Sequence, residues 1–321
     1  MSELNFNLHV DSSGDRIDLF LSKQFPDFSR SKIQKYIKDG SIRVGDNKVK
    51  PSWILSEGED IIGNIQPQTV IEVEPENIPL NVLYEDEHLI VINKQSGLVV
   101  HPGNGIKNGT LVNALLYHFK NLSQLDSTRP GIVHRLDKET TGVILVAKSE
   151  DVHQKLAKLF EKREVRKIYK AITWGKPKER DSITTNICRN PADRTLFTTS
   201  QTKGKEAHTI YKLDAYYRPL SVVSVGLKTG RTHQIRVHMK SIGHPIICDD
   251  DYSGGKKRIK SFHSKYNQQL TRVFKSINRV ALHAELLEFI HPVSGENLKV
   301  VAPLPEDMKN VISLLNEYGE A

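Results

Sequence analysis

Hydrophobic residues along this chain occur in short runs, and most of these runs have the composition of β-strands. Runs rich in Val, Ile and Leu, in places alternating with polar residues, predict strands. They are residues 89–92, 143–147, 167–174, 221–227, 280–290 and 298–302. Helical spacing is clearest at residues 110–119 and 149–162. Because strands outnumber helices and do not alternate with them regularly, we predict an α+β domain with a mixed, mainly antiparallel sheet.

The N-terminal part has a different pattern, with two short helices and a turn. Residues 16–25 predict an amphipathic helix. A second helix is predicted at residues 29–40, with Ser29 as its cap and Gly40 just beyond its end. Residues 42–49 place a Gly-Asp-Asn turn between apolar residues and predict a small hairpin. These elements indicate a small α/β module.

A stretch with little periodicity separates the two patterns. Residues 65–82 contain three prolines, which favour a partly extended linker. A chain of 321 residues also exceeds one typical domain. The predicted organisation is an N-terminal tail at 1–13, a small domain at 14–75, a linker at 76–82, a large domain at 83–312 and a C-terminal tail at 313–321.

Composition and spacing argue against several classes of protein. The apolar runs are far shorter than the roughly 20 residues that a membrane helix needs, and acids stand where a signal peptide would be basic and then apolar, so we expect a cytoplasmic protein. Cys188 and Cys248 are too few and too far apart for a disulfide framework or a metal site. Gly103, Gly105 and Gly109 resemble a dinucleotide-binding loop, but it is one residue too long. We expect no metal, no membrane and no obligate protein partner.

The net charge of +8 suggests a polyanionic partner, and its distribution strengthens the suggestion. A solvated helix face is the alternative for the basic block at residues 29–50, but its charge is almost of one sign and favours phosphate binding. The cations predicted to bind phosphate are Arg30, Lys32, Lys35, Lys38 and Arg43. Residues 253–279 hold eight Lys or Arg and no acid. They predict an insertion that contacts the polyanion, or a basic loop that orders only on binding it.

One carboxylate lies in a distinctive segment, GIVHRLDKETTGVILVAK. Asp137 occupies a polar stretch between two apolar runs, and Arg135 lies two residues before it. A lone loop Asp usually caps a turn, which is the simpler interpretation. Three further segments favour a chemical role: RKIYKAITWG with Tyr169, LKTGRTHQIRVHM with several cations, and LHAELLEFIHP.

Together these segments resemble the RluA/RluD family of RNA pseudouridine synthases. HRLDKETTG matches the segment that carries the family's essential aspartate, here Asp137. KIYKAITWG matches the tyrosine motif at Tyr169, and LKTGRTHQIRVH matches the basic motif at Arg231. INKQSGLVVHPG matches a fourth motif, with Gln95 in place of the usual proline. The resemblance runs from about residue 80 to residue 308.

The resemblance implies an isomerase that breaks the N1–C1′ bond of a flipped uridine and rejoins the base through C5. The implied catalytic residues are Asp137, Tyr169 and Arg231, with Arg231 paired to the aspartate and Tyr169 facing the uracil or acting as a base. Arg135 is expected to fill the vacated stack. The residues expected to contact RNA phosphates are Lys228, His233 and Arg236. His134 is expected to be packed rather than catalytic, and no cofactor is implied because the product is an isomer.

The basic N-terminal module bears on the choice of RNA. Residues 14–75 resemble the S4 RNA-binding domain, an appendage of the family branches that modify the large ribosomal subunit. We therefore expect large-subunit ribosomal RNA as the substrate, and transfer RNA as the second choice. The alternative from another class is a ribosome-assembly factor that binds RNA on this scaffold without catalysis.

Overall fold

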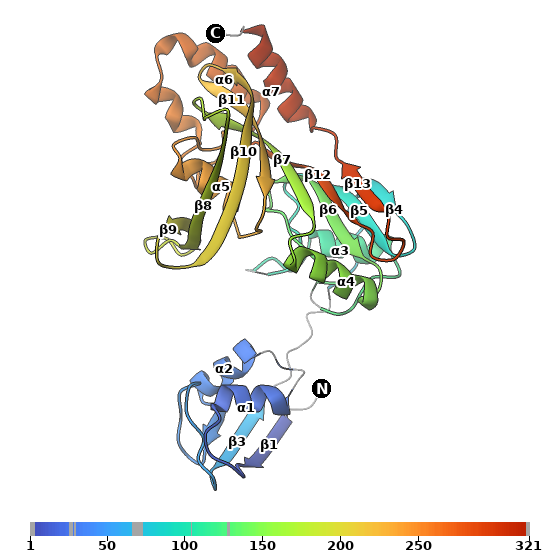
Figure 1. Cartoon of the computed structure of the whole chain (residues 1–321), viewed down its shortest axis with the longest axis vertical. Coiled ribbons are helices and arrows are strands. Elements are labelled where there is room, and N and C mark those ends of the chain that lie inside the picture. The colour runs from blue at the N-terminus through green and yellow to red at the C-terminus, as the bar shows by residue number, and fades with distance from the viewer. Residues whose placement is uncertain are drawn as a thin grey trace. The chain divides into compact units, whose positions relative to one another are not determined.

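The computed structural model describes residues 4–25, 28, 30–65, 73–103, 105–126 and 129–318. The chain divides into two compact units, Met1–Ile71 and Glu72–Ala321 (Figure 1). Each unit has a hydrophobic core of its own. None of the helices in the described ranges is long and apolar enough to cross a bilayer.

The smaller unit packs two helices on a three-stranded antiparallel sheet. Its strands lie in the order β1 (Leu4–His9), β3 (Asp60–Ile65) and β2 (Ile42–Val44). Helices α1 (Ile17–Gln24) and α2 (Arg30–Asp39) bury one apolar face each against this sheet. The predicted α/β module is therefore confirmed, although Ser29, its expected helix cap, lies outside the described residues.

Two details of the sequence prediction for this unit are wrong. The expected tail at residues 1–13 contains β1, which pairs with β3 from Leu4↔Ile65 to His9↔Asp60. Its partner is about fifty residues away, so a local pattern gives no sign of the pairing. The expected hairpin at residues 42–49 is only a tight turn with one bridge, and β2 pairs with β3 instead.

The larger unit is built on one mixed sheet, which has ten strands in the described residues (Figure 1). The order is β4-β5-β6-β12-β7-β11-β10-β8-β9, and β13 pairs with β12. The strands are β4 (Val82–Glu85), β5 (Leu89–Lys94), β6 (Thr141–Ala147), β7 (Arg166–Trp174), β8 (Arg180–Arg189), β9 (Phe197–Ser200), β10 (Lys205–Tyr217), β11 (Leu220–Leu227), β12 (Leu282–Ile290) and β13 (Asn297–Val301). Of these pairings, β6 with β12 is parallel and the rest are antiparallel. The predicted α+β class is confirmed.

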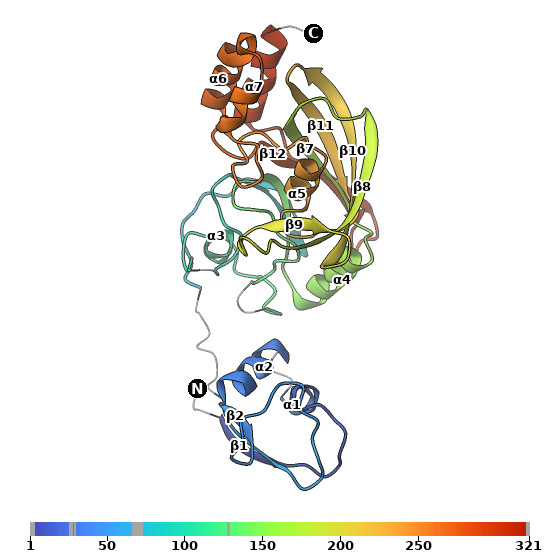
Figure 2. The same cartoon turned by 90° about the vertical axis from the view of Figure 1, so that its left-hand side faces the viewer.

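Helices cover both faces of this sheet. They are α3 (Leu111–His118), α4 (Glu150–Glu161), α5 (Gln234–Ser241), α6 (Asn267–Ser276) and α7 (Glu306–Glu317). Alternate residues of β5 belong to two cores: Ile90 and Ile92 join the core that includes α3, whereas Leu89 and Val91 join the core that includes α4. The helices α6 and α7 pack against each other (Figure 2). The helices predicted at 110–119 and 149–162 are confirmed.

The structure corrects two segment predictions in this unit. The described part of the linker packs against α3, because the Glu76 N–H donates to the Asn113 carbonyl at 3.0 Å and the Glu76 carboxylate accepts from Gly109 N–H at 2.7 Å. The expected C-terminal tail begins inside α7, whose Leu315 is fully buried. No helix was predicted there, although Met308, Val311, Ile312 and Leu315 have helical spacing.

The basic insertion at residues 253–279 is ordered rather than a loose loop. It contains two short 3-10 turns followed by α6, which confirms the helix expected near residues 266–274. Phe262 stacks on Trp174 with ring centroids 5.0 Å apart, and Leu270 and Val273 of α6 are fully buried. Most of its cations remain exposed, so contact with RNA stays a prediction.

A candidate active site around Asp137

Asp137 lies in a turn directly before the central strand β6. The turn is closed by the Thr140 N–H, which donates to the Asp137 carbonyl at 3.1 Å. At Gly142, φ is +109°, and a Cβ there would lie 2.1 Å from the carbonyl oxygen of Ala284. Only glycine therefore lets β12 approach β6 at this point, which explains the glycine that closes the motif.

A buried lysine holds this turn from one side. The Lys94 ammonium is fully buried and donates to three carbonyls, those of Gln95 and Leu98 at 2.9 Å and that of Lys138 at 3.0 Å. Burial lowers the pKa of Lys94 to about 7, although the nearby charge of Asp137 opposes the shift. Lys94 thus fixes the residue that follows Asp137.

A buried arginine holds the next carbonyl of the same turn. Arg279 Nη1 donates to the Glu139 carbonyl at 3.2 Å, and its Nε and Nη2 bind both carboxylate oxygens of Asp307 at 2.6 and 2.8 Å. The Glu139 carboxylate also accepts from the Val280 N–H at 3.0 Å. Two consecutive backbone carbonyls after Asp137 are therefore anchored by cations.

The Asp137 carboxylate itself faces the N-terminal part of α5. Arg236 Nη1 lies 3.7 Å from one carboxylate oxygen, and His233 Nε2 lies 4.0 Å from the other. The Asp137 side chain is 23% exposed, so a ligand can reach it. Burial and the charge of Arg236 outweigh the attraction of Asp137 and lower the pKa of His233, and the imidazole is neutral at pH 7.

Arg236 is fixed in place by two further carboxylates. Its Nε and Nη2 bind both oxygens of the fully buried Asp249 at 2.8 Å, and Nη2 also donates to Asp251 at 2.8 Å. Burial disfavours the guanidinium charge, but the hydrogen bonds and charge of Asp249 prevail and raise the pKa of Arg236. The planar guanidinium can hold Asp249 bidentately and still present Nη1 to Asp137.

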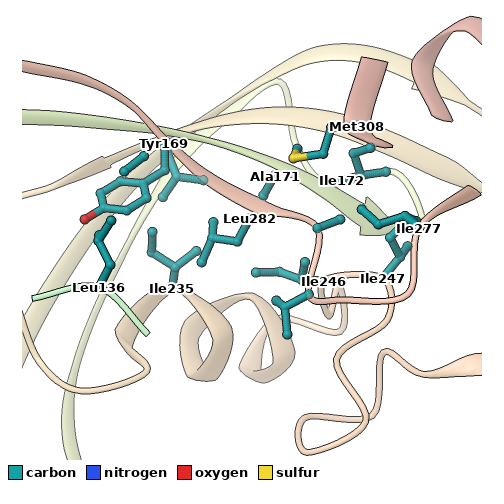
Figure 3. Packing of buried hydrophobic residues seen from close by; sticks show 14 of the residues in the cluster. Leu136, Tyr169, Ala171, Ile172, Ile235, Ile246, Ile247, Ile277, Leu282 and Met308 are labelled. Carbon is teal, nitrogen blue, oxygen red and sulfur yellow. The ribbon is translucent and has the colours of Figure 1, made fainter. Parts of the chain in front are cut away.

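Tyr169 and Asp137 line one pocket, whose volume is about 380 Å³. It lies on β7, opposite Val225 of β11 and Ala284 of β12. Leu136 and Ile235 also belong to the apolar cluster at this end of the pocket (Figure 3). Burial, and to a lesser extent Asp137, raises the pKa of Tyr169, so its phenol is protonated at neutral pH.

His134 is packed and hydrogen-bonded, as expected from the sequence. Its Nε2 accepts the Leu145 N–H at 2.9 Å, and its ring stacks on Phe160 at 4.8 Å between centroids. Burial, with a smaller contribution from Lys167, lowers the pKa of His134 to about 3. The ring is therefore neutral and serves the packing between β6 and α4.

Arg135 lies at the mouth of the site. Its side chain is exposed and lines the pocket of Tyr169 together with a second cavity of about 620 Å³ on the other side of Asp137. Within the described ranges its guanidinium has no hydrogen bond or ion pair. Its expected place in the vacated nucleic-acid stack stays a prediction.

Comparisons with known proteins show which family the chain resembles. One family model, described as RNA pseudouridylate synthase, matches residues 88–241, and another, described as S4 domain, matches residues 15–61. An uncharacterized RNA pseudouridine synthase of Aquifex aeolicus is 43% identical over 316 residues, covering 97% of this chain and 96% of that protein. The chain belongs to the RNA pseudouridine synthase family.

Further relatives support the assignment along nearly the full length of the synthase. A ribosomal large subunit pseudouridine synthase D of Xanthomonas campestris pv. campestris is 40% identical, covering 95% of this chain and 90% of that protein. Among solved structures, human RNA pseudouridylate synthase domain containing 4 has a TM-score of 0.57 at 27% identity, covering 73% of this chain and 92% of that chain. The synthase is an enzyme that forms pseudouridine in RNA.

The expected ion pair between Arg231 and Asp137 is wrong, because the structure gives that place to Arg236. Arg231 lies in the loop before α5 and its Nε donates to the Glu206 carbonyl at 2.9 Å. Arg236 was expected to contact phosphate, but α5 turns it inward. No helix was predicted at residues 234–241, so the sequence analysis could not separate Arg231, which precedes α5, from Arg236, which lies on it.

Several supporting residues of the synthase were also missed by the sequence analysis. Lys94, Asp249 and Arg279 all act on the site from buried positions. Lys94 stands in the INK motif, so a charged residue at the end of an apolar run was the one available signal. Lys228 is exposed, outside both cavities beside Asp137.

The predicted phosphate-binding cations of the S4 unit divide into two groups. Arg30 binds the fully buried carboxylate of Asp18 with Nε and Nη2 at 3.0 and 2.9 Å, so it serves the fold of this unit. Lys32 lies over the Phe28 ring at 4.5 Å and is partly buried. The others are exposed at the surface: Lys35, Lys38 and Arg43.

Proposed function

We propose that this synthase converts specific uridines of large-subunit ribosomal RNA into pseudouridine, with Asp137 as the reacting group. The observation that carries the proposal is the place of the Asp137 carboxylate. It stands beside Arg236, at 3.7 Å, and in a pocket whose wall includes Tyr169. A partly exposed carboxylate with a fixed cation and an aromatic neighbour suits chemistry on a flipped nucleotide.

The reaction requires little more than this group. The N1–C1′ bond breaks, the uracil turns, C5 bonds to C1′, and the proton leaves C5 as N1 gains one. Atoms and electrons balance without a co-reactant, because the product is an isomer. The carboxylate serves equally to attack the sugar carbon or to remove a sugar proton. Arg236 stabilises its charge until the base departs.

Tyr169 is proposed to support the uracil rather than to begin the reaction as a base. A base must be deprotonated, and both burial and the charge of Asp137 act against a phenolate by raising the pKa of Tyr169. The aromatic face suits stacking on the loosened base. Arg135 is proposed to fill the gap that the flipped nucleotide leaves, as a long planar cation can.

The choice of RNA rests on the relatives and on the S4 unit. Relatives that are about 40% identical over most of the chain are named ribosomal large subunit pseudouridine synthase D. The S4 unit adds a surface with Lys35, Lys38 and Arg43 exposed. Transfer RNA is the second candidate. With a ribosomal substrate, we propose that the synthase acts in the cytoplasm.

The experiment is release of tritium from ribosomal RNA that carries 5-tritiated uracil. We expect release by the wild-type protein and none by Asp137→Asn, which keeps the size of the side chain but removes its charge. RNA affinity of the variant should remain within about threefold, because phosphate contacts provide most of the binding. Release by Asp137→Asn at the wild-type rate would remove Asp137 from the mechanism. Release from transfer RNA alone would overturn the proposed substrate.

A further inference from the structure

The active pocket contains positive charge that its own carboxylates do not balance. Arg236 is occupied by Asp249 and Asp251. Lys167 lies two residues before Tyr169 on β7, and alternation along a strand places both on one face. Both line the pocket, whereas Ile168 between them does not.

Lys167 has no polar partner among the described residues. Within the described ranges, no carboxylate lies within 4.0 Å of its ammonium, and no carbonyl or hydroxyl accepts from it. Its ammonium lies over the Phe160 ring, with 5.5 Å between Nζ and the ring centroid. Burial lowers the pKa of Lys167, and no carboxylate offsets the shift. The Lys167 ammonium is not among the buried polar atoms without a partner, so solvent reaches it, and an anionic ligand that enters the pocket can replace that water.

Arg231 lines the same pocket as Lys167, and the backbone just before Arg231 passes close to the Lys167 ammonium. A Cβ at Gly230, the residue before Arg231, would lie 4.0 Å from the Lys167 ammonium. The backbone of Arg231 is fixed by Gln234, whose side-chain oxygen accepts its N–H at 3.0 Å. Its Nε is bound to a carbonyl, but within the described ranges its guanidinium has no carboxylate partner. The arginine freed from Asp137 is thus part of a second cationic site.

We propose that Lys167 and Arg231 together bind a backbone phosphate next to the target uridine. The inference rests on the proposed function, which places the sugar–base junction at Asp137 and the uracil at Tyr169. Residues two apart on a strand are separated by about 7 Å. This spacing suits the separation of base and phosphate within one nucleotide. The pocket then holds a single nucleotide between a carboxylate, an aromatic ring and two cations.

Binding of the phosphate would favour the flipped state of the target nucleotide. A phosphate reaches Lys167 only when its nucleotide has left the stack and entered the pocket. The contact therefore stabilises the flipped state and not the initial encounter with RNA, so the site assists the reaction by positioning the substrate.

The test uses RNA in which one phosphate has lost its charge. The sequence is that of a fragment on which the wild-type protein releases tritium, so the proposed function has already passed its own test. Three versions are made: all phosphate, methylphosphonate on the 5′ side of the target uridine, and methylphosphonate on its 3′ side. All carry 2′-O-methyl groups on the two vicinal sugars, which protect the neutral linkages. Binding is measured for the wild type and for Lys167→Met.

On the all-phosphate RNA we expect Lys167→Met to weaken binding about tenfold, the usual effect of a lost hydrogen bond to a charged group. On one of the two methylphosphonate RNAs the same substitution should cost less than about twofold, because its partner is already neutral. Lys167→Arg should bind nearly as the wild type does. Arg231→Gln should show the same dependence on that linkage.

The matched control is Lys299→Met, on the edge strand β13. Lys299 is exposed and lines neither cavity beside Asp137, so its affinity should not change. Thermal unfolding of each variant shows whether it is folded, and Lys167→Gln replaces Lys167→Met if that variant is not. An equal loss of affinity for all three RNAs would overturn the phosphate site and leave the proposed function standing.

Discussion

At the scale of single residues, the role of each arginine in the site depends on its hydrogen-bond and ion-pair partners. Arg236 is tied to Asp249 and faces Asp137, whereas Arg231, only five residues earlier, is bound to a backbone carbonyl. Both are arginines of one motif, and their different roles follow from the helix α5 that begins between them. Charge alone therefore does not define a role, because the backbone decides where each guanidinium points.

Tyr169 allows a prediction that separates its ring from its hydroxyl. Tyr169→Phe keeps the aromatic face, so RNA affinity should stay within a few-fold of the wild type. Tyr169→Leu removes that face and should weaken binding by the roughly 1–3 kcal/mol that stacking on one base contributes. Equilibrium binding at fixed salt is the measurement. Equal affinity for the phenylalanine and leucine variants would show that the uracil does not stack on this ring.

At the scale of secondary-structure elements, the C-terminal helix α7 is connected to the catalytic turn. Asp307 lies in its first turn and binds Arg279, which in turn donates to the Glu139 carbonyl. Lys94 at the end of β5 holds the preceding carbonyl. Elements far apart in the sequence thus fix the position of Asp137 through two adjacent peptide groups.

This connection predicts an effect of Asp307→Asn on turnover. The amide keeps the shape of the carboxylate but loses its charge and one acceptor, so Arg279 should hold the turn less firmly. We expect kcat to fall about 10- to 100-fold, as for a catalytic group that is misplaced slightly. RNA affinity should change less than about twofold. Single-turnover kinetics measures the change in rate, and equilibrium binding measures the change in RNA affinity.

Asp307→Glu is the matched control, because it keeps the charge and should recover part of the rate. If Asp307→Asn changed affinity and kcat in proportion, α7 would act on RNA binding rather than on the turn.

At the scale of the whole molecule, the two units have separate cores and separate tasks. The core of the S4 unit includes Ile17, Ile33 and Ile61, and it shares no residue with the core around β7. Its exposed cations lie on a unit without the catalytic turn. Binding and chemistry are therefore expected to be separable.

Removal of residues 1–71 tests this separation. The remaining unit keeps the complete sheet and should stay folded. RNA affinity should fall, and the slope of log affinity against log salt should become shallower by about 2 to 3, the value for three phosphate contacts made by Lys35, Lys38 and Arg43. Titrations at several salt concentrations measure the slope. An unchanged slope would mean that the S4 unit does not bind RNA phosphates.

Features that depend on neighbours along the chain could be predicted from the amino-acid sequence. Runs of apolar residues, in places alternating with polar ones, predicted β5, β6, β7, β11, β12 and β13. Helical spacing predicted α1, α2, α3 and α4. Motif order indicated the family through Asp137 and Tyr169. These signals are local, because a strand or a capped helix shows its buried face in a few consecutive residues.

Features that depend on partners far away in the sequence became visible in the folded structure. Strand β1 pairs with β3, and the long strands β8 and β10 pair with each other. Because the partners are separated in the sequence, a local pattern does not show these pairings. The same is true of the site. Arg236 was placed at Asp137 by the fold of α5 and by Asp249, and buried cations hold the catalytic turn. A charge acts at a few ångströms in space, and separation along the chain does not reveal that distance.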